Sequence, residues 1–143
     1  MPGNPAAREF TDLRRREAAS PMMLYAVDAA VPPGSPLTEL APLTEVARTA
    51  VRAGDGHVLD TSHVIFPNGA ITLVLILAES HLSIHTWPER DLIAIDLFSC
   101  GAIDGEAVIS ALTRDLRLES VAVQRITRGP AATLRQPADA GEP

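Results

Sequence analysis

Hydrophobic residues follow two different spacings along this chain, and each spacing predicts one kind of element. From Leu43 to Val51, apolar side chains recur every three or four residues, which is typical of a helix with one buried face. We expect this helix to begin at Pro42, because proline suits the first turn, and to end at Gly54. The same spacing predicts a second helix, marked by Ile103, Ala107, Val108, Ala111, Leu112 and Leu116.

The other apolar segments are shorter and predict β-strands. They cover residues 22–27, 57–66, 71–78, 81–87, 92–99 and 120–126. The segment ITLVLILA at 71–78 is apolar throughout, so we expect both of its faces to be buried. Strands joined in sequence by short turns favour antiparallel pairing.

The predicted order is β-α-β-β-β-β-α-β. We therefore expect an α+β fold, a two-layer α/β sandwich in which two helices cover one face of an antiparallel sheet. The other face needs a cover, and a second copy of the chain is the simplest candidate. Residues 1–20 are expected to form a flexible arm, residues 21–129 a single domain and residues 130–143 a disordered tail.

Composition restricts the chemistry that the chain can perform. All twelve basic residues are arginine, so mechanisms that need a lysine Schiff base or a P-loop lysine are excluded. The net charge of −6 argues against a nucleic-acid partner. There is no apolar run long enough for a membrane helix and no signal-peptide pattern, so we expect a soluble cytoplasmic protein with no membrane partner.

Reactive side chains gather in the segment LAESHLSIHTWPE, residues 77–89. A strand alternates its side chains between two faces. We expect Leu82, Ile84 and Thr86 to face the helices. The opposite face would then carry His81, Ser83, His85 and Trp87.

Three interpretations of these polar residues are open. They could form a solvated sheet face. They could bind a metal through His81, His85, Glu79 and Cys100, although no paired-cysteine or HExxH motif is present. They could perform nucleophilic chemistry, with Ser80 as nucleophile and a histidine as base. Cys100 is the single cysteine and cannot form an internal disulfide, so an inert buried thiol is its plainest interpretation.

Two motifs carry a resemblance to a known family. AESHLSIHTWPE at 78–89 and AIDLFSCG at 94–101 resemble the signature of the bacterial and archaeal S-adenosylmethionine decarboxylases. These are small pyruvoyl-dependent lyases of polyamine synthesis, including spermidine synthesis. The resemblance is densest over 78–101 and extends loosely over 57–129.

The resemblance implies a zymogen that cuts itself between Glu79 and Ser80. Attack of Ser80 on the carbonyl of Glu79 gives an ester, and elimination and hydrolysis then leave a pyruvoyl group derived from Ser80. This implied cofactor forms a Schiff base with the substrate amine and acts as an electron sink, without pyridoxal phosphate or lysine. His85 matches the histidine that assists processing, and Cys100 matches the proton donor to the substrate carbon.

The resemblance also suggests residues that bind substrate or support processing. Glu89 matches an acidic residue that can hold ribose hydroxyls, and Phe66 is a candidate for stacking on adenine, or else a core phenylalanine. The stretch GAITL at 69–73 departs from the usual GVSG of the family. Thr72 stands eight residues before Ser80, where the family has a serine that supports processing, and its hydroxyl could replace that serine.

The resemblance predicts S-adenosylmethionine as the small-molecule substrate and its decarboxylated form as the product. It also predicts a homodimer of cleaved protomers with active sites near the interface. Two alternatives stay open, namely a pyruvoyl-dependent decarboxylase of ornithine or arginine and a regulatory paralogue that never cleaves. No metal is expected.

Overall fold

The structure, a computed structural model, describes residues 22–35, 39–100 and 102–129. Its elements are β1 (Met22–Ala30), α2 (Leu40–Ala53), β2 (Val58–Ile65), β3 (Ile71–Leu77), β4 (Ser80–Trp87), the 3-10 turn η2 (Pro88–Arg90), β5 (Leu92–Ser99), α3 (Gly105–Asp115) and β6 (Glu119–Arg128). The predicted order of strands and helices is confirmed, with ends that differ by a few residues. The predicted arm, residues 1–20, and tail, residues 130–143, lie outside the described residues.

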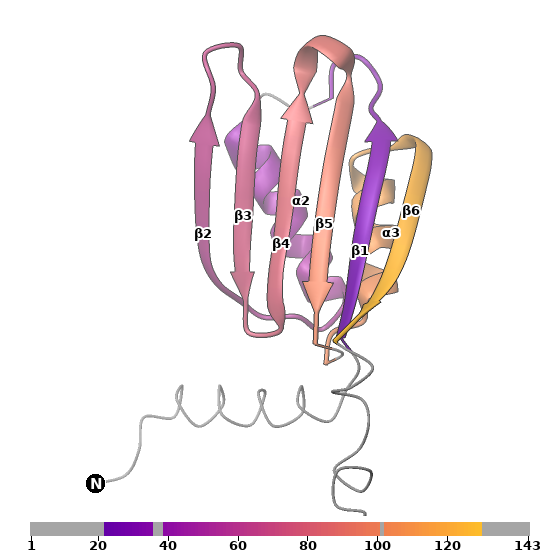
Figure 1. Ribbon diagram of the computed structural model, residues 1–143. Helices are drawn as coiled ribbons and strands as arrows, with labels where there is room; N and C mark the ends of the chain where they lie inside the picture. Colours follow the sequence, from indigo (N-terminus) through magenta and orange to yellow (C-terminus); the bar gives the residue numbers. More distant parts are fainter. Residues whose placement is uncertain (1–21, 36–38, 101, 130–143) are drawn as a thin grey trace, which may run out of the picture.

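The six strands form one sheet in the order β2-β3-β4-β5-β1-β6. All five neighbouring pairs are antiparallel. Both helices lie on the same face of the sheet (Figure 1). The two-layer α+β sandwich predicted from the sequence is therefore confirmed.

The hydrophobic core lies between the sheet and the two helices. Leu75, Leu82 and Leu97 are paired across β3, β4 and β5, and none of them has exposed surface. Burial of each such side chain contributes about 1.5–3 kcal/mol. Ile84 and Thr86 are also buried, which confirms the predicted inward face of β4.

Helix α2 begins at Leu40, two residues before the predicted start at Pro42. Pro42 is the third residue of the helix, where a backbone N–H has no acceptor within the helix, so its missing donor costs nothing. The helix ends at Ala53, and Gly54, the predicted stop, is its C-cap. Packing requires this glycine, because a Cβ there would lie 2.5 Å from the carbonyl oxygen of Asp104.

The other face of the sheet has no helix or strand over it among the described residues. In β3, Ile71 and Leu73 are buried, whereas Ile76 is 44% exposed. The prediction that both faces of 71–78 are buried is therefore wrong for a single chain, because both helices cover the same face. Strand register places several exposed apolar side chains on this open face, among them Val64, Ile76, Trp87, Leu92 and Ile126.

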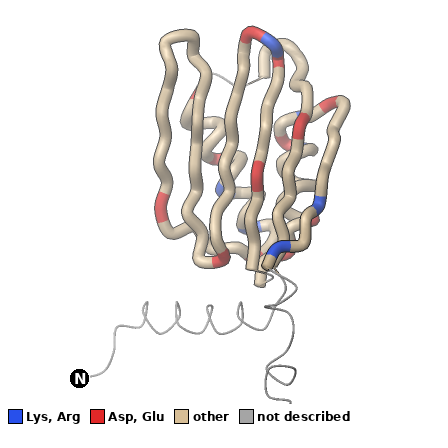
Figure 2. The backbone as a smooth tube through the Cα atoms, viewed as in Figure 1, with Lys and Arg blue, Asp and Glu red and all other residues tan. Residues whose placement is uncertain are grey.

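Charged positions are sparse along the central strands and lie mainly near strand ends and in connections (Figure 2). The open face carries polar as well as apolar side chains, because strand register also places Thr72, Ser83, His85 and Asp96 on it. No helix within the described ranges combines the length and apolar character that membrane crossing requires.

Candidate active site

The short turn between β3 and β4 places Ser80 beside Cys100. Ser80 begins β4 and is paired with Ser99 at the end of β5, so the next residue, Cys100, lies close to it. The Oγ atom of Ser80 is 3.2 Å from Sγ of Cys100. The backbone N–H of Cys100 donates a hydrogen bond of 3.1 Å to the carbonyl oxygen of Glu79. The predicted nucleophile, the predicted proton donor and the predicted scissile carbonyl thus meet in one place.

The backbone at Ser80 is strained. Its φ angle is 142°, a region that residues other than glycine rarely adopt. Such a conformation costs of the order of 1–3 kcal/mol and persists only where the surrounding structure imposes it. The strained residue is the one whose peptide bond to Glu79 is predicted to break.

The side chain of Glu79 has no exposed surface, and His57 supplies its hydrogen bonds. The backbone N–H of His57 donates to Oε1 of Glu79 over 2.8 Å, and Nδ1 of the His57 ring lies 2.8 Å from Oε2. Sequence reasoning missed His57, because it belongs to no motif. A buried glutamate does require polar partners, which is the one signal that could have prompted a search for such a residue.

Thr72 and His85 form a second cluster. They are paired across β3 and β4, and the hydroxyl of Thr72 lies 3.2 Å from Nδ1 of His85. The position that we expect to replace the family serine therefore contacts the predicted processing histidine. However, His85 is five residues from Ser80 along β4, which corresponds to about 16 Å at the usual rise of a strand.

The predicted substrate-binding residues lie at the far end of the sheet from Ser80. Glu89 follows β4, and its Oε2 accepts a 3.2 Å hydrogen bond from the amide of Asn68 in the β2–β3 turn. Phe66, in the same turn, is 46% exposed, so it is not a core residue. The β2–β3 and β4–β5 connections lie at one end of the sheet and the β3–β4 turn at the other (Figure 1). One chain therefore does not bring Phe66 or Glu89 to Ser80.

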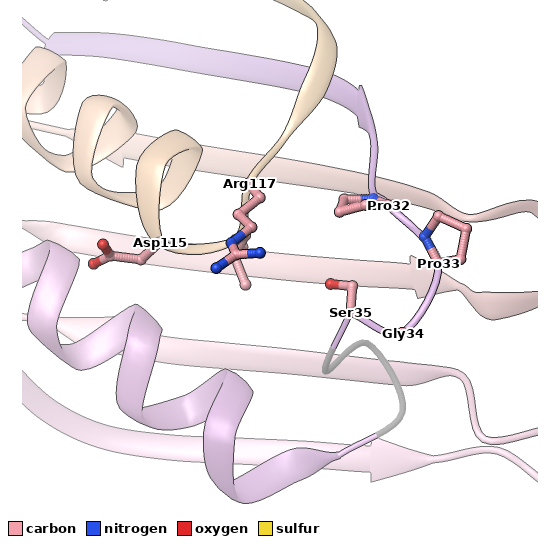
Figure 3. A pocket seen from close by; sticks show the side chains of 7 residues that line it. Pro32, Pro33, Gly34, Ser35, Asp115 and Arg117 are labelled. Carbon is pink, nitrogen blue, oxygen red and sulfur yellow. The ribbon is translucent and has the colours of Figure 1, made fainter.

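The described residues offer no cluster of metal ligands, and a cavity beside the end of α3 does not include Ser80. Among the described residues, no group of three or more His, Cys, Asp or Glu side chains could hold a metal ion. His81 instead lies against the ring of Phe98, with centroids 6.0 Å apart. A cavity of about 210 Å³ is lined by residues 32–35 and 115–117 and lies between the segment after β1 and the end of α3 (Figure 3). The end of β1 and the β3–β4 turn lie at opposite ends of the sheet (Figure 1).

Comparison with known proteins decides the family. A family model described as "S-adenosylmethionine decarboxylase" matches residues 24–129, well over half of the chain. This chain belongs to the S-adenosylmethionine decarboxylase family. The family predicted from the two sequence motifs is therefore confirmed.

Curated members of the S-adenosylmethionine decarboxylase family show the same relationship. The S-adenosylmethionine decarboxylase proenzyme 2 of Bacillus cereus is 37% identical over 82 residues, which is 57% of this chain and 67% of that protein. The S-adenosylmethionine decarboxylase proenzyme of Thermomicrobium roseum is 38% identical over 98 residues, which is 65% of this chain and 82% of that protein.

A solved member of the S-adenosylmethionine decarboxylase family has the same fold. The crystal structure of the adenosylmethionine decarboxylase from Aquifex aeolicus matches with a TM-score of 0.66 and 24% identity, over 78% of this chain and 92% of that one. This likeness supports the sandwich architecture. The individual roles of Ser80, His85, Cys100 and Thr72 stay predictions, as do those of the substrate-binding residues.

Proposed function

We propose that this protein is a self-processing, pyruvoyl-dependent decarboxylase of S-adenosylmethionine. The observation that carries the proposal is the cluster of Ser80, Cys100 and the Glu79 carbonyl in a chain of this family. The names of the relatives, which describe decarboxylase proenzymes, point to the same activity and to a precursor form. A cytoplasmic location and a role in polyamine synthesis stay predictions from the resemblance.

The first half of self-cleavage is an acyl shift that uses groups beside the scissile bond. The Oγ atom of Ser80 attacks the carbonyl carbon of Glu79, so a C–O bond forms, the C–N bond breaks and an ester results. Negative charge develops on the Glu79 oxygen during the attack. The Cys100 N–H, 3.1 Å from that oxygen, is placed to stabilise the charge.

The second half of self-cleavage is an elimination. A base removes the Cα proton of Ser80, the Cβ–Oγ bond breaks, and Glu79 leaves with a free carboxylate. The dehydroalanine that results takes up water and loses ammonia, which leaves a pyruvoyl group at the new N-terminus. We assign the base role to His85, whose ring is held by the hydroxyl of Thr72.

The strained φ angle of Ser80 supports cleavage at this bond. Part of the cost of holding a serine at 142° is released when its peptide bond to Glu79 becomes an ester, because the backbone is then free to rotate. The strain therefore lowers the barrier relative to that of a relaxed peptide in the same turn.

The residues around Ser80 also suit the decarboxylation step. A pyruvoyl group at this position would supply a carbonyl that reacts with an amine and accepts the electrons of the bond to the departing carboxylate. We assign to the Cys100 thiol the transfer of a proton to the substrate carbon after carbon dioxide leaves, and its Sγ atom, 3.2 Å from the Ser80 oxygen, supports this role. The chain contains no lysine, so this chemistry does not compete with a lysine-based one.

The distances within one chain support a homodimer that completes each site across an interface. Two open faces related by a twofold axis perpendicular to the strands would bring opposite ends of the two sheets together. Thr72, His85 and Glu89 of one copy could then approach Ser80 and Cys100 of the other. The exposed apolar side chains on the open face would be covered in the same contact.

Intact-mass analysis of the purified protein tests the proposed function. We expect two fragments split after Glu79, with a pyruvoyl end on the second, and carbon dioxide release from S-adenosylmethionine. The matched Ser80→Ala variant should stay whole, because it lacks the nucleophile. A wild type that stays at full length after long incubation would contradict self-processing. Release from ornithine or arginine, with none from S-adenosylmethionine, would contradict the substrate alone.

A further inference from the structure

The residue before the proposed cut, Glu79, is held at both of its polar ends. Its carbonyl oxygen accepts the N–H of Cys100, and its two carboxylate oxygens face the backbone N–H and the ring of His57. The Glu79 side chain is completely buried, so these partners, and not bulk water, satisfy its carboxylate. The orientation of the carbonyl is therefore coupled to the position of the His57 ring.

His57 is itself fixed to the same turn by the backbone. Its carbonyl oxygen accepts a 2.9 Å hydrogen bond from the N–H of Ala78, and the next residue, Val58, is paired with Leu77. His57 thus makes three hydrogen bonds to residues 78 and 79, one through its ring and two through its backbone. Only the ring bond depends on the side chain, so substitution can remove it while both backbone bonds stay.

We propose that His57 is a positioning residue for self-cleavage, which holds the Glu79 carbonyl in reach of the Ser80 hydroxyl and of the Cys100 N–H. The inference rests on the proposed self-processing function and adds a residue outside the motifs. Without the ring, Oε2 of Glu79 would be a buried acceptor with a lost partner, and the side chain would rotate to find another. A shift of about 1 Å at a reacting centre can cost about 100-fold in rate.

The environment of His57 allows its side chain to be changed without opening the core, which makes the proposal testable. The His57 side chain is 45% exposed. His57 also lines an open cavity of about 300 Å³, together with Arg48, Arg52, Gly56 and Val58. A smaller side chain there leaves the hydrophobic core intact.

The test compares the rate of precursor loss, measured by intact mass, in the wild type and in four variants, one of which is a control. His57→Ala removes the ring donor and should slow cleavage by about 10- to 100-fold. His57→Asn places an amide N–H where Nδ1 stood and should restore a rate close to that of the wild type. His57→Gln carries its amide one bond further out and should stay slow. His63→Ala, at an exposed histidine of β2, is the matched control and should cleave normally.

Urea unfolding of each variant in a Ser80→Ala background compares stabilities without cleavage. A ring that merely fastens β2 to the turn would alter this stability and leave the cleavage rate unchanged. Wild-type cleavage by His57→Ala, or equally slow cleavage by His57→Asn and His57→Ala, would overturn the positioning role and leave the proposed function standing. A wild type that never cleaves would overturn both.

Discussion

The hydroxyl of Thr72 lies 3.2 Å from Nδ1 of His85, across the ladder between β3 and β4. A hydrogen bond to one ring nitrogen fixes the orientation and the tautomer of a histidine, and so decides which nitrogen is free to take a proton. Thr72 belongs to the stretch at 69–73 that departs from the usual family pattern. Despite the departure, a hydroxyl is therefore in contact with the predicted processing histidine.

Removal of the Thr72 hydroxyl should therefore slow self-cleavage. Thr72→Val keeps the shape of the side chain and loses the hydrogen bond, so we expect precursor loss to slow by about 10- to 100-fold. Thr72→Ser keeps the hydroxyl and should cleave at close to the wild-type rate. Precursor half-lives from intact mass measure both. A Thr72→Val protein as fast as the wild type would show that the hydroxyl has no part in processing.

Cys100→Ala should separate cleavage from decarboxylation. The backbone N–H that contacts the Glu79 carbonyl remains in this variant, so self-cleavage should continue. Loss of the thiol removes the proposed proton donor, and general acid catalysis typically contributes about 10²–10⁴-fold in rate. Carbon dioxide release and the mass of the product measure the effect. Normal turnover with the normal product would return Cys100 to the interpretation of an inert thiol.

A homodimer with shared sites predicts complementation between two inactive variants. Ser80→Ala lacks the nucleophile, and His85→Ala lacks the proposed base, so each alone should remain uncut. In a mixed dimer, one site would combine the intact Ser80 of one copy with the intact His85 of the other. Coexpression of differently tagged copies should then give cleavage of the His85→Ala chain.

The control for complementation pairs variants from the same cluster. Coexpression of Thr72→Val with His85→Ala should give no gain over Thr72→Val alone, because both residues would come from the same copy at every site. No cleavage of the His85→Ala chain in the mixture with Ser80→Ala would indicate that each site is built from a single chain. Size measurements on the Ser80→Ala protein would report the oligomeric state independently.

The contact between Glu106 and Arg125 should make stability depend on pH. Nη2 of Arg125 donates a 2.9 Å hydrogen bond to Oε2 of Glu106, which ties β6 to the first turn of α3. This hydrogen bond lowers the pKa of Glu106 below its ordinary value of 4.5. A lowered pKa in the folded state means that the pair stabilises the fold above pH 4.5, and that this stability disappears as the pH falls through the folded pKa.

Glu106→Gln should therefore reduce the free energy of unfolding at pH 7 and have little effect near pH 3. Both side chains are about half exposed, so the reduction should be small. Urea titrations in the Ser80→Ala background measure it, with Glu119→Gln, an exposed position without this contact, as the control. An equal loss of stability at both pH values would indicate that the charge of Glu106 is irrelevant.

The sequence predicted both α-helices and all six strands of the described fold, but neither the 3-10 turn η2 nor the arrangement of the strands. Helical and alternating spacings depend on neighbouring residues, so they located the helices and strands to within a few positions. The neighbours of a strand depend on contacts between distant segments. β1 pairs with β5 and with β6, whose residues are 60 or more positions away along the chain, and no local pattern encodes that choice.

The candidate site was predictable to a similar extent. The motifs located Ser80, Cys100 and His85, and the register of β4 and β5 then accounts for the contact between the first two. Grouping Glu89 with Ser80 overlooked the length of the intervening strand, which spans more than about 20 Å at the usual rise. His57 could not be found from the sequence, because 22 residues separate it from Glu79 and only the folded sheet joins them.

The place of β1 between β5 and β6 governs what happens to the two fragments after a cut behind Glu79. The first fragment would hold β1, α2, β2 and β3, and the second would hold β4, β5, α3 and β6. They would alternate in the sheet and share three ladders, β3–β4, β5–β1 and β1–β6. Neither fragment could dissociate without breaking the backbone hydrogen bonds of all three ladders. The mature protein would thus consist of two interleaved fragments that dissociate no faster than the whole domain unfolds. Dilution alone would not separate them.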